Sequence, residues 1–326
     1  MTDPYSFTLT RTGGPEVLEA EHIDIPSPGP GQVLVRHEAV GLNFIDTYHR
    51  SGLYKLPLPS GIGGEGAGVV EAVGEDVEGV RVGDRVGYFT GPLGSYASHR
   101  TVAADRLVKL PDDIAFEEAA AAMLKGCTVE YLVERCAQID PGEPVLVHAA
   151  AGGVGTILVQ WLKAMGAIVI AHSGDSRKAA LATELGADHS LCCPMDELAA
   201  AVRSITAGKG VPVVLDGVGA ASWTASLGSI ARRGLIVTYG NASGPVPPFS
   251  PLELVSAGSI FVTRPTLADY CATAAETKAS AARLFEMMTS GKVKVRIGAR
   301  MKLLEAADAH RAIESRATTG STVLLP

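Results

Sequence analysis

Small residues at positions 150, 152 and 155 have the spacing of a glycine-rich turn that binds phosphate. In the segment PVLVHAAAGGVGTILVQWLKAMG, Ala150 replaces the first glycine of the pattern, and Gly152 and Gly155 follow. Gly152 would let the backbone approach a pyrophosphate, and Gly155 would let a helix pack closely on the preceding strand. The amino end of that helix would offer unpaired N–H groups to phosphate. Because the motif follows an apolar strand and opens a helix, it predicts dinucleotide binding rather than a tight turn without a ligand.

The residues after the next predicted strand bear on which dinucleotide is bound. This strand ends near His172, where an acidic residue would accept the ribose 2′-hydroxyl of NAD. The tip is instead Ser173, and Arg177 and Lys178 follow as cations that could hold a 2′-phosphate. Asp175 favours NAD, but counted from the strand end it belongs to the loop and would cap the next helix. We therefore predict NADPH, and the alternative is that both cations are solvated residues at the start of a helix.

These segments belong to a region in which strands and helices alternate. From about residue 144, six apolar strand-like runs are separated by helical patterns, which predicts a doubly wound parallel sheet. One uncharged stretch, 145–162, has the length of a membrane span. Its glycines, together with His148 and Gln160, indicate a buried strand that turns into a buried helix instead.

The region before residue 125 is predicted to be rich in β-structure. Short β-rich runs at 33–44, 67–74, 83–89 and 95–102 are bounded by glycine, proline and aspartate. Many short strands of this kind predict a compact, barrel-like domain, taken here as antiparallel. The last 60 or so residues are predicted to be largely helical and to pack back on this first domain.

Composition narrows the class of protein. Lys and Arg number 28 and Asp and Glu 35, so the formal net charge is −7. This charge, without a basic–aromatic stripe, makes nucleic acid an unlikely partner. Five cysteines without a C-x-x-C spacing indicate reduced thiols rather than a disulfide framework. The polar N-terminal segment lacks a hydrophobic signal core, so we expect a cytoplasmic protein that is not attached to a membrane.

Segments spread over the whole chain point to one family. In order, they are GGPEVLE, GLNFIDTYHRSGLY, LKGCTVEYL, AAGGVG, RRGLIVTYGNASG, FVTRP and ESRATTGS. This set resembles the quinone oxidoreductases (zeta-crystallin-like), a zinc-free branch of the medium-chain dehydrogenase/reductase superfamily. The resemblance implies an α/β fold with a GroES-like β-rich catalytic domain, residues 1–125 and 267–326, and a six-stranded Rossmann domain, residues 126–266. It also implies a homodimer paired through the last Rossmann strand, within GSIFVTRP.

The resemblance also implies a set of cofactor contacts. These fall on Asn43, Thr128, Gly153, Val154, Ser173, Lys178, Tyr239, Gly240, Ser243, Val262, Arg264 and Arg316, which join Gly152, Gly155 and Arg177 from the motifs above. Two positions depart from the family pattern. Cys193 stands where family members often have a Tyr near the adenosine, and Gly217 stands where relatives often have a Ser.

The positions that hold zinc in relatives carry other residues here. Zinc-dependent members of the superfamily use a Cys and a His, and Asn43 and Gly64 stand at the matching places. The closely spaced cysteines of the relatives' structural zinc site are also absent, and Cys127 is offset by three residues from the third catalytic ligand. Zinc needs about three protein ligands, so we predict no metal. Alcohol oxidation is then disfavoured, whereas a quinone or enone is already electrophilic.

The predicted catalytic set lies on one short segment, LNFIDTYHRSGLY, which the resemblance places beside the nicotinamide. Asn43 and Tyr54 are the best candidates for hydrogen bonding to substrate or cofactor. Tyr48 has core packing as its alternative role, and Asp46 is expected to orient its neighbours rather than transfer protons. No Ser-His-Asp set or carboxylate pair that shares a proton is recognised, so solvent is the expected proton source.

Three functions are compatible with these residues. The leading hypothesis is an NADPH-dependent reductase of small quinones that works without a metal. An NADPH-dependent reductase of enones or enoyl thioesters would use a nearly identical site on the same fold. A low-turnover NADPH-binding protein, similar to a crystallin, is the third.

Overall fold

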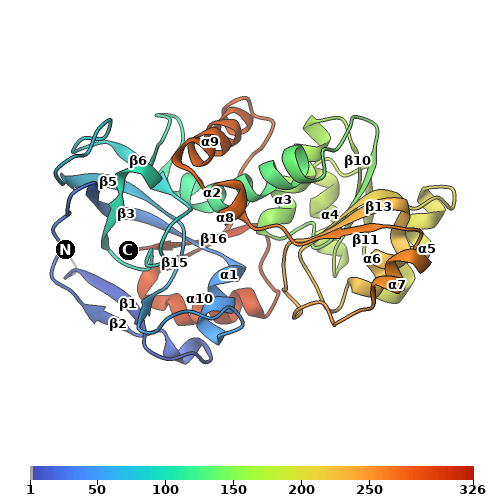
Figure 1. Cartoon of the computed structure of the whole chain (residues 1–326), viewed down its shortest axis with the longest axis horizontal. Helices are drawn as coiled ribbons and strands as arrows, with labels where there is room; N and C mark the ends of the chain where they lie inside the picture. The colour runs from blue at the N-terminus through green and yellow to red at the C-terminus, as the bar shows by residue number, and fades with distance from the viewer. Residues whose placement is uncertain (1–2) are drawn as a thin grey trace. The chain divides into compact units, whose positions relative to one another are not determined.

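The computed structural model describes residues 3–326, and the chain divides into two compact units. Unit 1 comprises Met1–Cys127, Cys271–Thr289 and Val295–Pro326, and unit 2 comprises Thr128–Tyr270 and Ser290–Lys294. Within unit 1, the red C-terminal elements lie among the blue and teal N-terminal ones (Figure 1). The predicted division into a catalytic domain, residues 1–125 and 267–326, and a cofactor domain, residues 126–266, stays a prediction.

Unit 2 is built on one parallel sheet of six strands (Figure 1). The strands lie in the order β11 (His189–Leu191), β10 (Ile168–His172), β9 (Pro144–Val147), β12 (Val211–Asp216), β13 (Ile230–Thr238) and β14 (Phe261–Thr263). Every neighbouring pair is parallel. The helices of the unit are α3 (Gly153–Ala164), α4 (Ser176–Glu184), α5 (Met195–Ile205), α6 (Trp223–Ser229), α7 (Pro251–Ser256) and α8 (Leu267–Tyr270). The prediction of a six-stranded, doubly wound parallel sheet is confirmed.

Apolar runs explain why the central strands of this sheet are buried. Val145, Leu146 and Val147 on β9 have no exposed surface, and neither do Leu158 and Trp161 on α3. Burial of side chains of this size contributes about 1.5–3 kcal/mol each. The uncharged stretch 145–162 is thus a core strand followed by a core helix, as expected. Within residues 3–326, no helix combines the length and the apolar character that crossing a membrane requires.

Unit 1 contains a seven-stranded sheet and a three-stranded one. The larger follows the order β15 (Ile297–Lys302), β16 (Ser321–Leu325), β3 (Gln32–Leu42), β5 (Gly66–Val73), β6 (Arg85–Tyr88) and β8 (Val108–Lys109), with β7 (His99–Ala103) also paired to β3. The smaller joins β2 (Ala20–His22), β1 (Tyr5–Leu9) and β4 (Ser60–Gly61). Pairing is antiparallel except between β15 and β16.

The helices of unit 1 carry several of the predicted site residues. They are α1 (Phe44–Ser51), α2 (Phe116–Glu130), α9 (Ala274–Thr289) and α10 (Ala306–Glu314), and a π-helical segment, Tyr131–Cys136, continues α2 into unit 2. Short 3-10 turns lie at Pro15–Val17, Ala104–Arg106 and Leu303–Glu305.

Two expectations for unit 1 are wrong in part. The run 33–44 is a strand only to Leu42, because α1 begins at Phe44 and Asn43 is its extended N-cap, with φ −127° and ψ 151°. The C-terminal region forms α9 and α10 as expected, but it also forms β15 and β16. Strand β16 pairs with β3, with Leu324 opposite Val40. This partner lies at the far end of the sequence, so local periodicity could not reveal the strand.

Candidate functional site

The predicted cofactor residues of unit 2 gather at the carboxyl ends of its strands. From β9, the chain adds β10 and β11 toward one edge of the sheet. From β12, it adds β13 and β14 toward the other edge, so the junction between β9 and β12 is a topological switch point. Ligands of doubly wound sheets bind in the crevice outside such a point. The glycine-rich turn follows β9, Ser173 follows β10, Tyr239 and Gly240 follow β13, and Arg264 follows β14.

The turn after β9 has the geometry that phosphate binding requires. Ala149 has a φ of +51°, in the left-handed region, and Gly152 is the extended N-cap of α3. A Cβ at Gly155 would lie 2.3 Å from the carbonyl oxygen of Ala149, so only glycine fits there without moving the turn. Gly153 and Val154, at the start of α3, are partly exposed, which leaves the amino end of the helix accessible.

The tip of β10 matches the sequence-based placement of the strand end. The strand ends at His172, and Ser173 is 3% exposed with a hydroxyl that makes no hydrogen bond among the described residues. Asp175 is the N-cap of α4, where its side chain accepts from the Lys178 N–H at 2.8 Å. Its carboxylate also lies 3.7 Å from the Lys178 ammonium. Asp175 thus caps a helix, and exposed Arg177 follows in the first turn.

The loop after β13 rests on the turn after β12. The Tyr239 ring lies over Gly217, where a Cβ would be 2.8 Å from it, and a Cβ at Gly240 would be 2.3 Å from the Gly217 carbonyl oxygen. The Ser243 N–H donates to the Val218 carbonyl at 2.8 Å. The departure at Gly217 therefore has a steric reason, because a larger residue would displace the aromatic ring.

Three further positions complete the view of the predicted cofactor set in unit 2. Arg264 donates to the carbonyl of Thr238 at 2.8 Å, and the buried Thr238 hydroxyl makes no hydrogen bond among the described residues. Val262 packs against the hydrophobic core of the sheet, and Thr128 is buried near the end of α2. Thr238 was not singled out from the sequence, since an ordinary β-strand threonine carries no local signal of a site.

A buried polar network behind the glycine-rich turn was also missed. Asp216, at the end of β12, accepts from Ser222 and Ser226 of α6 at 2.7 and 2.8 Å. Ser226 lies 3.0 Å from Nε2 of His148, the residue before the turn. Because the Ser226 hydroxyl has one proton and faces a carboxylate, we assign the proton of His148 to Nε2. Desolvation lowers the pKa of His148 to about 4, so the ring is neutral and its one N–H serves the local hydrogen bond to Ser226.

Cys193 lies just after the end of β11. Its carbonyl oxygen accepts from His172 Nε2 at 3.0 Å, which joins the end of β10 to the segment after β11. The side chain is partly buried, and burial raises the pKa of its thiol. Cys193 therefore presents a small, neutral side chain at this position, where the resemblance implies a Tyr in many family members.

In unit 1, the structure brings Asn43 and Asp46 together at the start of α1. Asp46 has no exposed surface, and its Oδ2 accepts from the Asn43 N–H at 2.8 Å and from the Tyr96 hydroxyl at 3.2 Å. Tyr96 also lies 2.9 Å from Nε2 of His310, which is buried beside Arg50. Burial raises the pKa of Asp46 to about 7. Asp46 thus closes the capping box at the start of α1, and its role in catalysis stays a prediction.

The two tyrosines of the predicted catalytic set lie next to each other. The ring centroids of Tyr48 and Tyr54 are 5.2 Å apart, and those of Tyr48 and Phe44 are 5.8 Å apart. Tyr48 is buried and Tyr54 is partly exposed. Tyr54 is therefore the better placed of the two to present its hydroxyl to a ligand. Arg316, from the same unit, lies in the turn after α10 with a φ of +59°.

Two charged residues beside Asn43 were not part of the predicted set. Glu65 has no exposed surface, and its Oε2 accepts from Asn43 Nδ2 at 2.8 Å. Lys125 of α2 is 5% exposed, and its Nζ lies 3.5 Å from the same oxygen. The sequence offered a partial signal in the segment GGEGAG, but the lysine is distant in the chain. Glu65 and Asp46 are both buried next to Asn43, a pairing of carboxyl groups that the sequence did not suggest.

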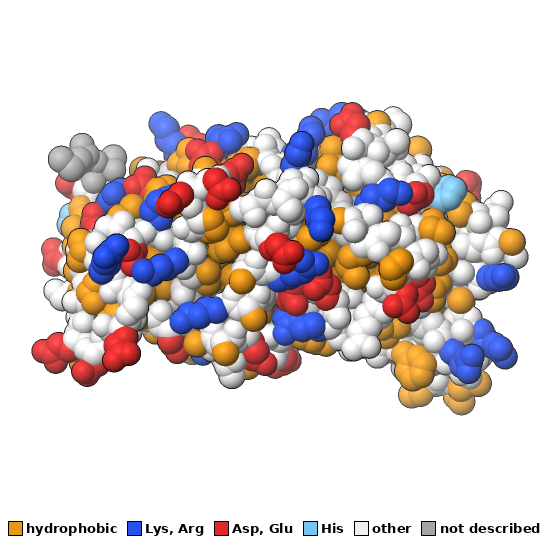
Figure 2. Space-filling view, turned by 90° about the horizontal axis from the view of Figure 1, so that it is seen from above, with side chains coloured by type: hydrophobic (Ala, Val, Ile, Leu, Met, Phe, Trp, Pro, Cys, Tyr) orange, Lys and Arg blue, Asp and Glu red, His pale blue; other side chains and the backbone are white. Residues whose placement is uncertain are grey.

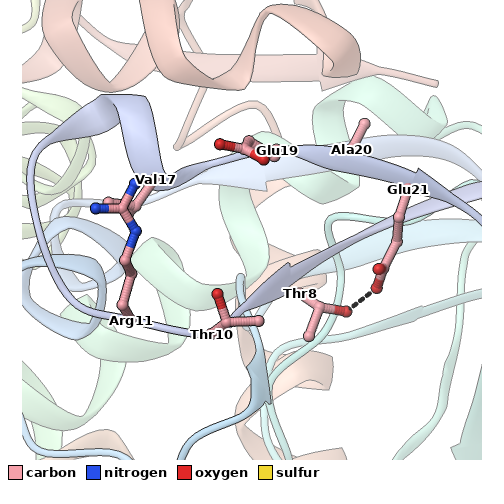
Figure 3. A pocket seen from close by; sticks show the side chains of 7 residues that line it. All are labelled: Thr8, Thr10, Arg11, Val17, Glu19, Ala20 and Glu21. Carbon is pink, nitrogen blue, oxygen red and sulfur yellow. Dashed lines mark hydrogen bonds between the residues drawn. The ribbon is translucent and has the colours of Figure 1, made fainter.

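Neither a surface hollow nor a metal cluster competes with these sites. A hollow of about 380 Å³ in unit 1 is lined by β1, β2 and the segment that joins them, and it contains none of the predicted site residues (Figure 3). Its lining residues are Thr8, Thr10, Arg11, Val17, Glu19, Ala20 and Glu21. Over residues 3–326, no three His, Cys, Asp or Glu side chains are grouped to hold a metal. The absence of zinc stays a prediction.

Comparison with known proteins identifies the two halves of the chain. A model of the alcohol dehydrogenase GroES-like domain matches residues 29–112, and a model of the zinc-binding dehydrogenases matches residues 153–287. The first match lies within unit 1, and the GroES-like part of the predicted fold is confirmed.

Individual relatives cover almost the whole chain. A quinone oxidoreductase of Pseudomonas aeruginosa is 50% identical over 96% of this chain and 97% of its own length. A 2-haloacrylate reductase of Burkholderia is 40% identical over 98% of both chains. The crystal structure of Escherichia coli quinone oxidoreductase complexed with NADPH has a TM-score of 0.96 at 43% identity, and covers 99% of this chain and 100% of that one. The chain belongs to the quinone oxidoreductase family of the medium-chain dehydrogenase/reductase superfamily.

Proposed function

We propose that this chain is an NADPH-dependent reductase of small quinones that works without a metal ion. The observation that carries the proposal is the tip of β10, where a small, neutral Ser173 precedes two cations, Arg177 and Lys178. The nearby acid, Asp175, is engaged as a helix cap. A 2′-phosphate is bound by cations at a strand tip that lacks an acid. The quinone oxidoreductases among the relatives, one of them crystallised with NADPH, support the same conclusion.

Bound NADPH would supply the hydride that reduces the substrate. The residues of unit 2 fit this cofactor, because the glycine-rich turn leaves room for a pyrophosphate and Ser173 and Thr238 have buried hydroxyls without hydrogen bonds among the described residues. The N–H groups at the start of α3 would bind the pyrophosphate. The proposed contacts of this unit are Thr128, Gly152, Gly153, Val154, Gly155, Ser173, Arg177, Lys178, Tyr239, Gly240, Ser243, Val262 and Arg264.

The proposed residues of the reduction site come from unit 1. Asn43 would contact the cofactor or substrate through its side-chain amide, and Arg316 is proposed as a further cofactor contact. Tyr54 would donate its hydroxyl to the oxygen that gains negative charge during hydride transfer. Asp46 is a positioning residue, because it is buried and bonds to the Asn43 N–H. Tyr48 would support Tyr54 by ring packing.

A steady-state assay tests the proposed function. NADPH oxidation is measured with a panel of small quinones and with a panel of enones. In the opposite direction, NADP reduction is measured with ethanol-like alcohols. We expect clear turnover with quinones and far less with alcohols, since no Lewis acid would polarise an alkoxide. Robust oxidation of alcohols would contradict the proposal.

A reductase of enones is the second candidate function. The 2-haloacrylate reductase of Burkholderia, at 40% identity, favours it, because a haloacrylate is an activated alkene. Hydride addition to an enone and to a quinone makes the same demand on the protein, namely stabilisation of an oxyanion. The enone panel separates the two, and kcat/KM for enones far above that for quinones would promote this candidate.

We propose further that the protein is a homodimer paired through β14. This strand is the last of its sheet, and Phe261 on it is 63% exposed. Leu252 and Val255 on the neighbouring α7 are 72% and 64% exposed. Hydrophobic side chains also gather at the lower right of Figure 2, on the side of the picture where Figure 1 has α7. An edge strand with this much exposed apolar surface favours pairing with a second copy.

A further inference from the structure

A buried ion pair in unit 1 has no evident role in stability. Glu65 is fully buried and Lys125 is 5% exposed, with 3.5 Å between Oε2 and Nζ. The Lys125 ammonium makes no hydrogen bond among the described residues. Removing two charges from water costs about as much as their attraction returns, so buried pairs of this kind contribute little to folding. Buried charged groups with perturbed pKa values cluster at functional sites, although structural ion pairs also produce them.

All the groups bonded to Glu65 are donors. Its Oε2 accepts from Asn43 Nδ2 at 2.8 Å, and its Oε1 accepts from the Leu124 N–H at 2.7 Å. Burial raises the pKa of Glu65, and the positive charge of Lys125 and these two hydrogen bonds oppose that rise. Because each neighbour donates, the carboxylate is used as an acceptor only.

The other groups packed around Glu65 do not favour its charge. Asp46 of α1 and Tyr88 of β6 interact with it electrostatically, and a second negative charge at Asp46 would oppose ionisation. On β3, Gly41 lies so close that a Cβ there would be 2.2 Å from Oε2. Lys125 therefore supplies the positive charge that favours the ionised form of this carboxyl group.

An ionised Glu65 fixes the direction of the Asn43 amide. A side-chain amide can present its NH₂ or its carbonyl oxygen to a given neighbour, and only the NH₂ can bond to an acceptor. We propose that Lys125 and Glu65 are positioning residues of the reduction site, which hold the Asn43 amide with its nitrogen on Glu65. The amide oxygen then faces the Asp46 N–H in the capping box of α1, and its second lone pair would accept a hydrogen bond from the bound cofactor or substrate. This inference rests on the proposed function, because Asn43 is a proposed contact.

The test removes the lysine and follows NADPH binding against pH. Without Lys125, Glu65 is protonated at lower pH, becomes a donor and can turn the amide around. We expect Lys125→Met to bind NADPH at least about tenfold more weakly than wild type near pH 6.5, a difference of about 1.4 kcal/mol. The loss should shrink as the pH is raised, because Glu65 ionises again. Lys125→Arg keeps the charge and should stay within about threefold of wild type.

A double variant separates positioning from a structural role. Glu65→Gln combined with Lys125→Met removes both buried charges, so its thermal unfolding should return toward wild type. Its NADPH affinity should stay low and independent of pH, because the amide that replaces the carboxylate can present either its oxygen or its nitrogen to Asn43. Lys109→Met, which removes an exposed lysine paired with the partly buried Asp84, is the control and should leave binding unchanged.

Three results would overturn the inference. They are wild-type affinity in Lys125→Met near pH 6.5, a loss that is constant over the pH range, and a double variant that regains affinity together with stability. Since binding is read directly by NADPH fluorescence, these outcomes are independent of the electron acceptor. A wild-type protein that binds NADPH but reduces no quinone would instead contradict the proposed function and leave this inference to be judged by the binding data.

Discussion

At the scale of single residues, the choice of cofactor depends on a few charges after β10. Ser173 leaves the strand tip small and neutral, and the carboxylate of Asp175 faces the first turn of α4 instead. Arg177 and Lys178 each could contribute about 1–3 kcal/mol to a 2′-phosphate through charge-assisted hydrogen bonds. The residues themselves therefore predict a preference for NADPH over NADH of at least about tenfold, or about 1.4 kcal/mol.

Lys178→Ala tests this preference. NADPH binding should weaken by about tenfold while NADH binding changes little, because only NADPH carries the 2′-phosphate. Fluorescence titration with each cofactor measures both affinities. Lys163→Ala, which removes an exposed lysine paired with Asp188, is the control and should alter neither. Equal losses for both cofactors, or a wild-type preference for NADH, would show that Asp175 governs the site.

Asp46 predicts an unusual dependence of stability on pH. Burial raises its folded-state pKa to about 7, whereas an unfolded Asp titrates near 3.9. Between these values the folded state binds more protons, so the contribution of Asp46 to the free energy of unfolding falls as the pH rises toward about 7. Relative to wild type, Asp46→Asn should therefore become more stable as the pH rises from about 5 to about 8.

Urea unfolding at several pH values measures this difference. Asp308→Asn, at an exposed position on α10, serves as the control and should differ from wild type by a constant amount. A difference for Asp46→Asn that does not change with pH would show that the Asp46 carboxyl is ionised throughout.

At the scale of elements, the turn between β9 and α3 depends on close backbone approach. A Cβ at Gly155 would meet the Ala149 carbonyl oxygen at 2.3 Å, and backbone cannot move aside as a side chain can. The Asp216–Ser226–His148 network lies behind the same turn and joins β12, α6 and the end of β9. The turn is therefore held on both sides, by packing of α3 and by buried hydrogen bonds.

Gly155→Ala is expected to open this turn. The variant should lose about 1–3 kcal/mol of stability through overpacking and bind NADPH at least about tenfold more weakly. Thermal unfolding and cofactor titration measure the two effects. Gly29→Ala is the matched control, because a Cβ there would meet its nearest atom, on the flexible Gln32 side chain, at 3.4 Å. Unchanged cofactor affinity in Gly155→Ala would separate the turn from cofactor binding.

At the scale of the whole molecule, the first question is assembly. The exposed Phe261 on the edge strand β14, with Leu252 and Val255 nearby, predicts a dimer with a continuous sheet. Light scattering at micromolar concentration should give the mass of two chains. Phe261→Glu should shift the protein toward monomer, whereas Leu304→Glu, at an exposed leucine of unit 1, should not. A monomeric wild type would refute the assignment.

The second question is metal content. One matching family model is described as zinc-binding, yet Gly64 has no side chain and Asn43 Nδ2 donates to Glu65. A donating amide nitrogen offers no lone pair to a metal. Elemental analysis of the purified protein should find no stoichiometric zinc, and chelators should leave activity unchanged. A content near one zinc per chain would contradict this prediction.

The sequence by itself determined the architecture of unit 2 and the position of its crevice. The strand at 145–147, the turn through Gly155 and the strand end at His172 follow from patterns only a few residues long, which local physics decides. The segments that resemble the quinone oxidoreductase family also predicted the GroES-like fold of unit 1. The start of α1 was missed because Asn43 continues an apolar run and takes an extended conformation while it caps a helix.

The tertiary structure alone decided which distant residues meet. Strand β16 exists through its pairing with β3, and Glu65 acquires Asn43 and Lys125 as neighbours only when three separate segments pack together. The same holds for Asp216 with His148, which meet through Ser226 of α6. A buried charge or hydroxyl gains its role from partners far away in the chain, and such partners leave no periodic trace in the sequence.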